Sequence, residues 1–235
     1  MDTIDDRSLV LDSIFYETPH HRILQGARLQ IVPGAICGLF GRNGSGKSTL
    51  LKVAAGEIIP DSGLTIIDGE RFPGRSLIRR FSRISWLPQD SMLPGDMRVN
   101  DLICSFPATS RTVSEDPVIH AFTGHRIREL SVGNRRYLEI RLLLSLDRTY
   151  VLLDEPFSGI DPNIIERITD LVTAAAKAGK GILLTDHYYR DTIPLVDDAY
   201  IMIDHRCVHL NPELDLKEQL LGYHYLSPQQ QDQPH

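Results

Sequence analysis

Hydrophobic and polar positions alternate along the first part of the chain, as they do in strands with one buried face. Residues 8–33 are expected to be extended, interrupted by a polar turn at 17–21 and followed by a Pro-Gly turn at 33–34. A short apolar run at 64–67, followed by Asp-Gly at 68–69, predicts a hairpin. The chain is therefore expected to begin with an antiparallel β subdomain.

The remainder alternates between short apolar runs, typical of buried strands, and longer segments with helical spacing. Strands are expected at 35–40, 84–87, 150–155, 182–185, 199–203 and 207–210. Helices are expected at 47–55, 134–146 and 163–178, with a short one at 190–195. This alternation predicts an α/β fold with a mostly parallel core sheet and right-handed crossovers.

Strand character fades between about 90 and 128, where prolines break the chain into short, weakly helical pieces. We expect a small helical subdomain at about 90–135, inserted into one domain that spans residues 1–226. Residues 227–235 are rich in Gln and Pro and are expected to form a disordered tail.

Composition narrows the class of protein. The formal net charge of −6 gives no support for a nucleic-acid binder, and a hydrophobic content of 42% suffices for a full core. No apolar run approaches the roughly 18 residues of a membrane-spanning helix, and the acidic start of the chain lacks the layout of a signal peptide. The three cysteines have neither pairing nor metal-site spacing. We expect a soluble protein of a reducing compartment.

The segment after the strand at 35–40 carries the strongest chemical signal. It matches the phosphate-binding pattern G-x-x-x-x-G-K-[ST] and predicts a P-loop NTPase. Glycines let the backbone approach an anion, and the start of the next helix adds about half a positive charge. Lys47 is expected to reach the outer phosphates of a nucleoside triphosphate, and Ser48 to bind Mg²⁺. The predicted nucleotide-binding residues here are Gly41, Asn43, Gly44, Ser45, Gly46, Lys47, Ser48 and Thr49.

Two carboxylates, Asp154 and Glu155, end the strand expected at 150–155. Because open α/β sheets bind ligands at the carboxyl ends of their strands, Asp154 can hold Mg²⁺ directly or through water. Glu155 can orient and deprotonate an attacking water, an effect worth about 10²–10⁴-fold in rate. Alone, the pair is also compatible with simple solvation of a strand end. Beside a phosphate loop, it predicts hydrolysis of the nucleotide.

Over roughly residues 7–222 the chain resembles the ATP-binding-cassette (ABC) ATPases. The resemblance rests on six short motifs that occur in the family's order and at its approximate spacing. They are the Walker A loop at 41–48, the Q-loop Leu-Pro-Gln89, the signature segment Leu130-Ser-Val-Gly-Asn134, the Walker B carboxylates Asp154-Glu155, the D-loop Ser158-Gly-Ile-Asp161, and Thr185-Asp186-His187. The resemblance implies ATP and Mg²⁺ as ligands.

The resemblance also implies catalytic roles. Gln89 is expected to contact both Mg²⁺ and the attacking water, so the implied metal ligands are Ser48, Gln89 and Asp154. His187 is expected to contact the γ-phosphate. The implied catalytic residues are therefore Glu155, Gln89 and His187.

Further residues are implied at the nucleotide and between protomers. Tyr16 occupies the place of an aromatic residue that stacks on adenine, and core packing is the alternative for this side chain. Asp161 is implied to couple two protomers. Ser131 and Gly133 are implied to bind the γ-phosphate held by the opposite protomer, since Ser131 suits a helix N-cap and a helix start favours an anion.

The signature segment departs from the family form Leu-Ser-Gly-Gly-Gln. Val132 replaces a glycine and Asn134 replaces a glutamine. A β-branched residue forced to positive φ costs on the order of 1–3 kcal/mol, so either the backbone is ordinary here or the half-site is weakened. We expect a slow but active ATPase.

Within the family, the segments 156–162 and 183–191 resemble the lipopolysaccharide-export ATPase subunit, and the branched-chain amino-acid importers are similar here. We expect an ATPase subunit of an ABC transporter, peripheral to the inner or plasma membrane through a separate transmembrane permease. ATP would close a head-to-tail dimer, formed with itself or with a related cassette, and hydrolysis would reopen it. The region 89–129 is expected to receive the permease, no nucleic-acid partner is expected, and cargo and direction do not follow.

Two other hypotheses are weaker. A non-transport ABC ATPase of a regulatory or DNA-repair assembly usually carries coiled-coil insertions, extra domains or tandem cassettes, and this sequence has none. A P-loop kinase or GTPase needs a substrate lid or a guanine-specificity motif, and it leaves the segment at 130–134 unexplained.

Overall fold

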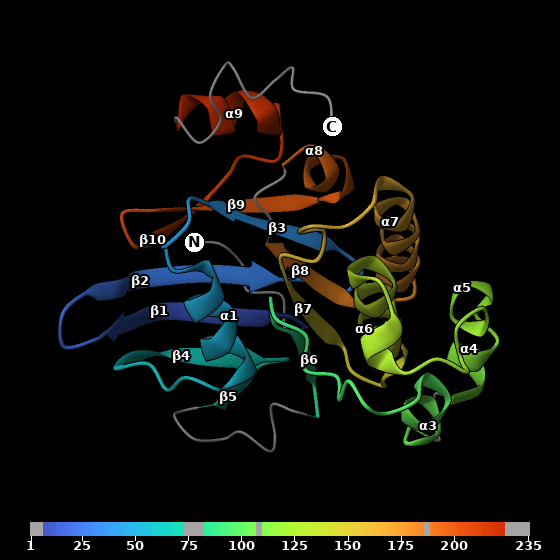
Figure 1. The fold of residues 1–235 in the computed structure, drawn as a ribbon. Helices are drawn as coiled ribbons and strands as arrows, with labels where there is room; N and C mark the ends of the chain where they lie inside the picture. Colours follow the sequence, from blue (N-terminus) through green and yellow to red (C-terminus); the bar gives the residue numbers. More distant parts are fainter. Residues whose placement is uncertain (1–6, 73–81, 107–109, 186–188, 224–235) are drawn as a thin grey trace.

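Two β-sheets and the helices around them form the part of the chain that the structure describes, residues 7–72, 82–106, 110–185 and 189–223 of a computed structural model. Figure 1 shows the arrangement of these elements. The tail expected at 227–235 lies outside the described residues.

The larger sheet has six strands in the order β10-β9-β3-β8-β7-β6, and every neighbouring pair is parallel except β10 and β9. Its strands are β3 (Ile36–Gly41), β6 (Ile84–Leu87), β7 (Tyr150–Asp154), β8 (Gly181–Thr185), β9 (Asp198–Ile203) and β10 (Arg206–His209). Strands β3, β7 and β8 are buried along their whole length, as expected for a parallel sheet covered on both faces. The predicted mostly parallel core is confirmed.

The smaller sheet is antiparallel throughout, in the order β2-β1-β4-β5. Its strands are β1 (Leu9–Glu17), β2 (Arg22–Ile31), β4 (Ser62–Ile67) and β5 (Glu70–Phe72). The hairpin predicted at 64–69 joins β4 to β5, so the N-terminal antiparallel subdomain is also confirmed.

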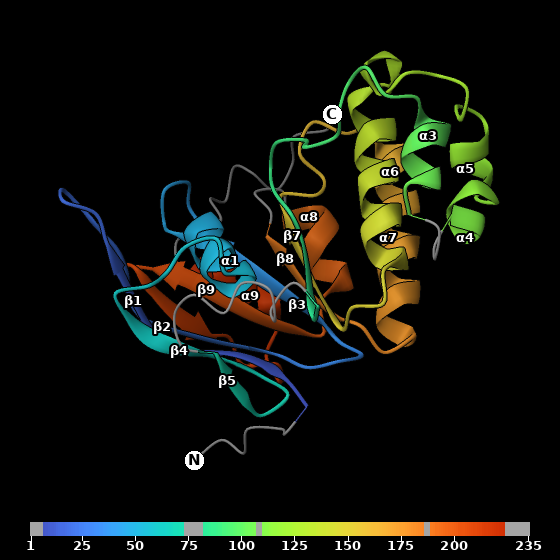
Figure 2. The same ribbon diagram turned by 90° about the horizontal axis from the view of Figure 1, so that it is seen from below.

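Helix α1 (Lys47–Ala55) lies between the two sheets, as Figures 1 and 2 show. Its residues Leu50, Leu51 and Val53 are fully buried in one core cluster with side chains of β1, β2 and β3. Gly56 ends the helix in the left-handed conformation, directly after the range 47–55 predicted from the sequence. This packing therefore fixes the position of α1 relative to β3.

The opposite face of the six-stranded sheet is covered by α6 (Val132–Ser145) and α7 (Pro162–Lys177), which pack with β7 and β8 in a second cluster. Beyond α6 lie the short helices α3 (Val99–Cys104), α4 (Ser110–Ser114) and α5 (Pro117–His120), which form the predicted helical subdomain. In Figure 2 these helices gather at the end of the molecule away from the antiparallel sheet. The sequence did not predict α4.

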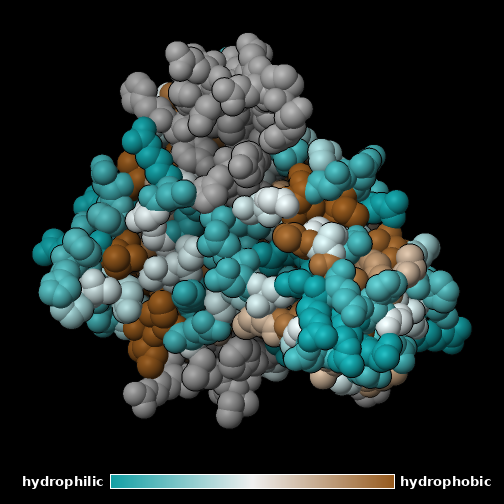
Figure 3. All heavy atoms as spheres, viewed as in Figure 1, coloured by the Kyte–Doolittle hydropathy of each residue, from teal (hydrophilic) through white to brown (hydrophobic). Residues whose placement is uncertain are grey.

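The C-terminal part adds α8 (Tyr189–Thr192) and α9 (Leu216–Gly222), and α9 was not predicted. Asp215 caps α9. Leu220 of this helix packs on Phe40, Ile201 and Leu210. None of the helices in the described ranges is both long and apolar enough to cross a membrane. On the face shown in Figure 3, hydrophobic residues form small separate patches among hydrophilic ones.

One buried carboxylate holds the helical subdomain together. Asp116 caps α5 by accepting the N–H groups of Val118 (3.0 Å) and Ile119 (3.4 Å). The same carboxylate accepts the hydroxyl of Tyr137 and Nε of Arg141, both at 3.0 Å and both on α6. Burial raises the pKa of Tyr137, and so does its hydrogen bond to Asp116, so the phenol stays a donor.

Replacing Asp116 by Ala is expected to lower the free energy of unfolding by about 2–4 kcal/mol, because the partly buried Arg141 loses its anion while a helix cap is lost. The neighbouring Glu115→Ala is the control: Glu115 is exposed and follows α4, where it pairs with the exposed Arg111, so its loss should cost less than about 1 kcal/mol. Urea unfolding followed by Trp86 fluorescence measures both. Equal costs for the two variants would contradict this account.

Candidate functional site

The loop between β3 and α1 is shaped to receive an anion. Gly46 precedes the helix with φ 108°, and a Cβ there would lie 2.8 Å from the carbonyl oxygen of Ile23. Only glycine fits this position, because both the backbone angle and the space exclude a side chain. Having no side-chain cap, the N–H groups at the start of α1 can bind a ligand, and the helix dipole favours a negative one.

Lys47 is buried beside this loop. Its Nζ donates to the carbonyl oxygens of Gly41 (2.6 Å) and Arg42 (3.2 Å). The hydroxyl of Ser45 is buried and has no hydrogen-bond partner among the described residues. A buried ammonium and an unsatisfied hydroxyl in the same loop can both bind oxygen atoms of a phosphate.

A cavity of about 380 Å³ brings the loop together with one residue of β2 and with residues that follow β6 and β7. It is lined by Ile23, Asn43, Gly44, Ser45, Gly46, Lys47, Ser48, Thr49, Gln89 and Glu155. A neighbouring cavity of about 310 Å³ is lined by Ser48, Gln89 and Asp154, among others. Gln89 follows β6, and Asp154 and Glu155 stand at the end of β7, so three separate segments meet here.

The two carboxylates are organised by one residue of β8, Thr185. Its hydroxyl donates to Oδ1 of Asp154 at 2.6 Å and accepts the N–H of Glu155 at 3.0 Å. The carbonyl oxygen of Thr185 also accepts that N–H, at 3.0 Å. These contacts hold Glu155 at φ 48°, a left-handed conformation that non-glycine residues seldom adopt. The motif at 185–187 indicates no role for the hydroxyl of Thr185, because that role depends on the pairing of β7 with β8.

Gln89 contacts Glu155 directly. The Nε2 atom of Gln89 donates to Oε2 of Glu155 at 2.8 Å, although the two residues are 66 positions apart in sequence. This bond leaves the amide oxygen of Gln89 available for a cation. Ser48, Gln89 and Asp154, which each carry a side-chain oxygen, line one cavity, and hard oxygen donors of this kind suit Mg²⁺. No cluster of three or more His, Cys, Asp or Glu residues with metal-site geometry occurs in the described residues, so further ligands would come from phosphate or water.

The signature residues lie elsewhere. Ser131 caps α6, because its hydroxyl accepts the N–H of Asn134 at 3.1 Å. Val132 begins the helix in an ordinary helical conformation, which excludes the strained backbone with positive φ. Its side chain is 64% exposed. Gly133 is buried against the D-loop, where an added Cβ would lie 3.2 Å from Ile160.

Asp161 of the D-loop is exposed and caps α7, accepting the N–H of Asn163 at 2.8 Å. Ser131, Gly133 and Asp161 line neither of the two cavities around the phosphate loop. His187 lies outside the described residues. The structure thus joins the Walker A, Q-loop and Walker B residues and leaves the signature and D-loop residues at a separate surface.

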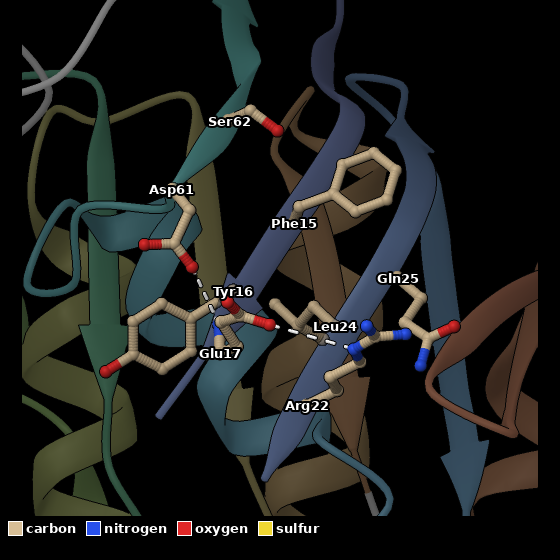
Figure 4. A pocket seen from close by; sticks show the side chains of 8 residues that line it. All are labelled: Phe15, Tyr16, Glu17, Arg22, Leu24, Gln25, Asp61 and Ser62. Atoms are coloured by element: carbon tan, nitrogen blue, oxygen red, sulfur yellow. Dashed lines mark hydrogen bonds and ion pairs between the residues drawn. The ribbon is translucent and has the colours of Figure 1, made fainter. Parts of the chain in front are cut away.

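Tyr16 lines a third cavity, of about 370 Å³, formed by β1, β2 and the start of β4 (Figure 4). Phe15 and Tyr16 point to opposite sides of β1; Phe15 is exposed and lies over Gly26, 3.2 Å from where a Cβ would stand. Tyr16 is half-buried beside the cluster that contains α1, and Ile23 lines the phosphate-loop cavity from the same subdomain. Its stacking on a base stays a prediction.

Comparison with known proteins identifies relatives. Residues 24–158 match the sequence model of a family described as "ABC transporter". The chain is 31% identical to the lipopolysaccharide export system ATP-binding protein of Haemophilus influenzae, over 77% of this chain and 80% of that protein. It is 30% identical to the protein of the same description from Escherichia coli K12, over 87% and 91%.

Solved structures agree on the fold. An ATP-binding cassette of an ABC transporter matches with a TM-score of 0.81 at 21% identity, covering 93% of this chain and 97% of that one. A dimeric bacterial ABC transporter cassette matches with a TM-score of 0.74 at 18% identity, covering 85% and 96%.

Replacing Thr185 by Val is expected to lower nucleotide hydrolysis about 10–100-fold, because Asp154 loses its donor and Glu155 loses a restraint. Thr185→Ser keeps the hydroxyl and should stay within about threefold of the parent. Steady-state turnover measures both, with thermal unfolding as a check on folding. If Val and Ser variants were equally active, the hydroxyl would have no role in the reaction.

Proposed function

We propose that this chain, which belongs to the ABC transporter family and is therefore an ATPase, couples ATP-driven closure of a dimer to transport by a separate membrane subunit. The proposal rests on one observation: the expected nucleotide-binding residues lie on two separate surfaces of the chain. The phosphate loop, Gln89 and Glu155 share one cavity, whereas the start of α6 at Ser131 lies outside it. One chain therefore offers two half-sites.

The phosphate loop would hold the triphosphate. Backbone N–H groups at the start of α1 would donate to the anion, and Lys47 would exchange its contacts with loop carbonyl oxygens for contacts with the outer phosphates. Thr49 and Asn43 line the same cavity and complete the enclosure. Tyr16 would stack on the adenine, as the resemblance implies.

Ser48, Gln89 and Asp154 would hold Mg²⁺, whose charge, when bound there, neutralises the phosphates during transfer. Glu155 would act as general base, taking a proton from the attacking water. The hydrogen bond from Gln89 orients that carboxylate, and Thr185 fixes its backbone. His187, as the family pattern implies, would contact the γ-phosphate.

A second protomer would supply the missing half. Ser131 and Gly133 stand at the start of a helix of 14 residues, whose dipole favours the γ-phosphate held by the partner. Val132 is exposed at the same place, where a partner would cover it. Asp161 lies on the neighbouring D-loop, which packs on Gly133 through Ile160. Both self-association and pairing with a related cassette fit these surfaces.

The membrane subunit would dock on the side of the Q-loop. The cavity of about 310 Å³ there is lined by Trp86 and by Met92, which is 67% exposed, as well as by Gln89. A partner seated at this place touches the loop that carries Gln89, which links docking to the active site. The chain would thus be a cytoplasmic protein, peripheral to the membrane, and its relatives favour the lipopolysaccharide-export branch.

Replacing Glu155 by Gln is expected to trap ATP-bound dimers, because nucleotide closes the interface and the missing base prevents its hydrolysis. Size-exclusion chromatography with MgATP should show the variant as a dimer. Lys47→Ala is the matched control: it keeps Glu155 but loses phosphate binding, and it should remain monomeric. A Glu155→Gln variant that binds ATP yet stays monomeric would refute the closure mechanism.

Replacing Val132 by Gly is expected to leave turnover within about twofold, because the helical backbone stores no strain for glycine to relieve. The change should lower the free energy of unfolding by less than about 0.5 kcal/mol, because valine and glycine differ only slightly as helix formers and Val132 is the first residue of α6. Val132→Ala removes the branched side chain without that cost and serves as the control. A large gain in turnover for Gly but not for Ala would show that the valine does strain the signature.

A further inference from the structure

A buried arginine of α6 holds the backbone of the Q-loop. Arg136 is 8% exposed, and its guanidinium donates to the carbonyl oxygen of Pro88 at 2.9 Å and to that of Gln89. A guanidinium is a rigid planar fork, so two contacts with successive carbonyl oxygens set the orientation of the peptide between them. Neither Arg136 nor any other residue of α6 lines the two cavities around the phosphate loop.

A second buried residue of α6 reinforces this contact. Glu139 lies one helical turn after Arg136, 3.4 Å from its guanidinium, and accepts the hydroxyl of Ser91 at 2.5 Å. Helix α6 therefore binds the Q-loop on both sides of Asp90. Burial lowers the pKa of Arg136, and the carboxylate of Glu139 opposes that shift, so the arginine keeps its charge.

One exposed side chain, that of Gln89, connects the contact between α6 and the Q-loop to the carboxylate of Glu155. Gln89 is exposed, and its amide donates to Oε2 of Glu155 at 2.8 Å. Because an exposed side chain has little packing to hold it, the place of its amide depends on where its backbone stands. That backbone is the part that Arg136 binds.

We propose that Arg136 is a positioning residue for ATP hydrolysis, which acts by holding the Q-loop backbone so that Gln89 meets Glu155. The inference rests on the proposed function, in which Glu155 is the general base. It adds that the single helix α6 serves both half-sites. At its start α6 would present Ser131 to the nucleotide of the partner, and one turn later its Arg136 would orient Glu155 of the same chain through Gln89. Rotation of the helical subdomain would then move Gln89.

A double-mutant cycle tests this inference, with Arg136→Met, Gln89→Ala and the double variant compared at saturating MgATP. Each single change is expected to lower kcat about tenfold, and KM for ATP is expected to change less than twofold. Once Gln89 is gone, Arg136 has nothing to position, so the double variant should lie within about twofold of Gln89→Ala. Independent tenfold losses in both backgrounds, or an unchanged kcat in Arg136→Met, would overturn the inference.

Matched variants separate this role from stability. Arg111→Met removes an exposed arginine of the same subdomain, paired with Glu115, and should leave kcat unchanged. Arg136→Gln keeps one donor and the helix, so it should give an intermediate kcat even if the Met variant folds poorly. Amide hydrogen exchange at 89–92 should quicken in both Arg136 variants and not in Arg111→Met. A parent protein without ATPase activity would instead refute the proposed function.

Discussion

The carboxyl ends of four neighbouring parallel strands lie at one edge of the core sheet, and the candidate site depends on this constraint. Strand β3 leads into the phosphate loop, β6 into Gln89, β7 into the two carboxylates, and β8 ends at Thr185. Parallel strands require crossover connections, so residues far apart in sequence must meet at such an edge. The positions of β8 between β3 and β7, and of β7 between β8 and β6, decide which groups touch.

This edge concentrates buried charge. Lys47, Asp154, Glu155, Arg136 and Glu139 are all at most 8% exposed. Burial of charged groups is costly unless hydrogen bonds satisfy them, and here backbone carbonyl oxygens, Thr185, Gln89 and Ser91 do so. Glu155 adds backbone strain at φ 48°. The well-packed core around α1 and the covered strands offset these costs.

Two successive contacts connect the helical subdomain to that edge. Asp116 joins α5 to α6 inside the subdomain, and Arg136 joins α6 to the Q-loop outside it. Because α6 is a continuous helix of 14 residues, its start and its contact with the Q-loop move as one body. The geometry therefore links the exposed signature surface to the cavity that holds Glu155, with no long flexible segment between them.

The sequence by itself determined the α/β class, the strand that carries the phosphate loop, and helix α1 with its glycine end, because local periodicity and glycine positions encode these features. It also identified Gln89, Asp154 and Glu155 as candidates through short motifs. It missed α4 and α9, whose apolar patterns are only a turn or two long and whose stability comes from tertiary packing. Only the tertiary structure showed that Val132 has an ordinary backbone and that Thr185 and Arg136 hold the carboxylates and the Q-loop, because these roles depend on strand order and on contacts between residues 30–48 positions apart.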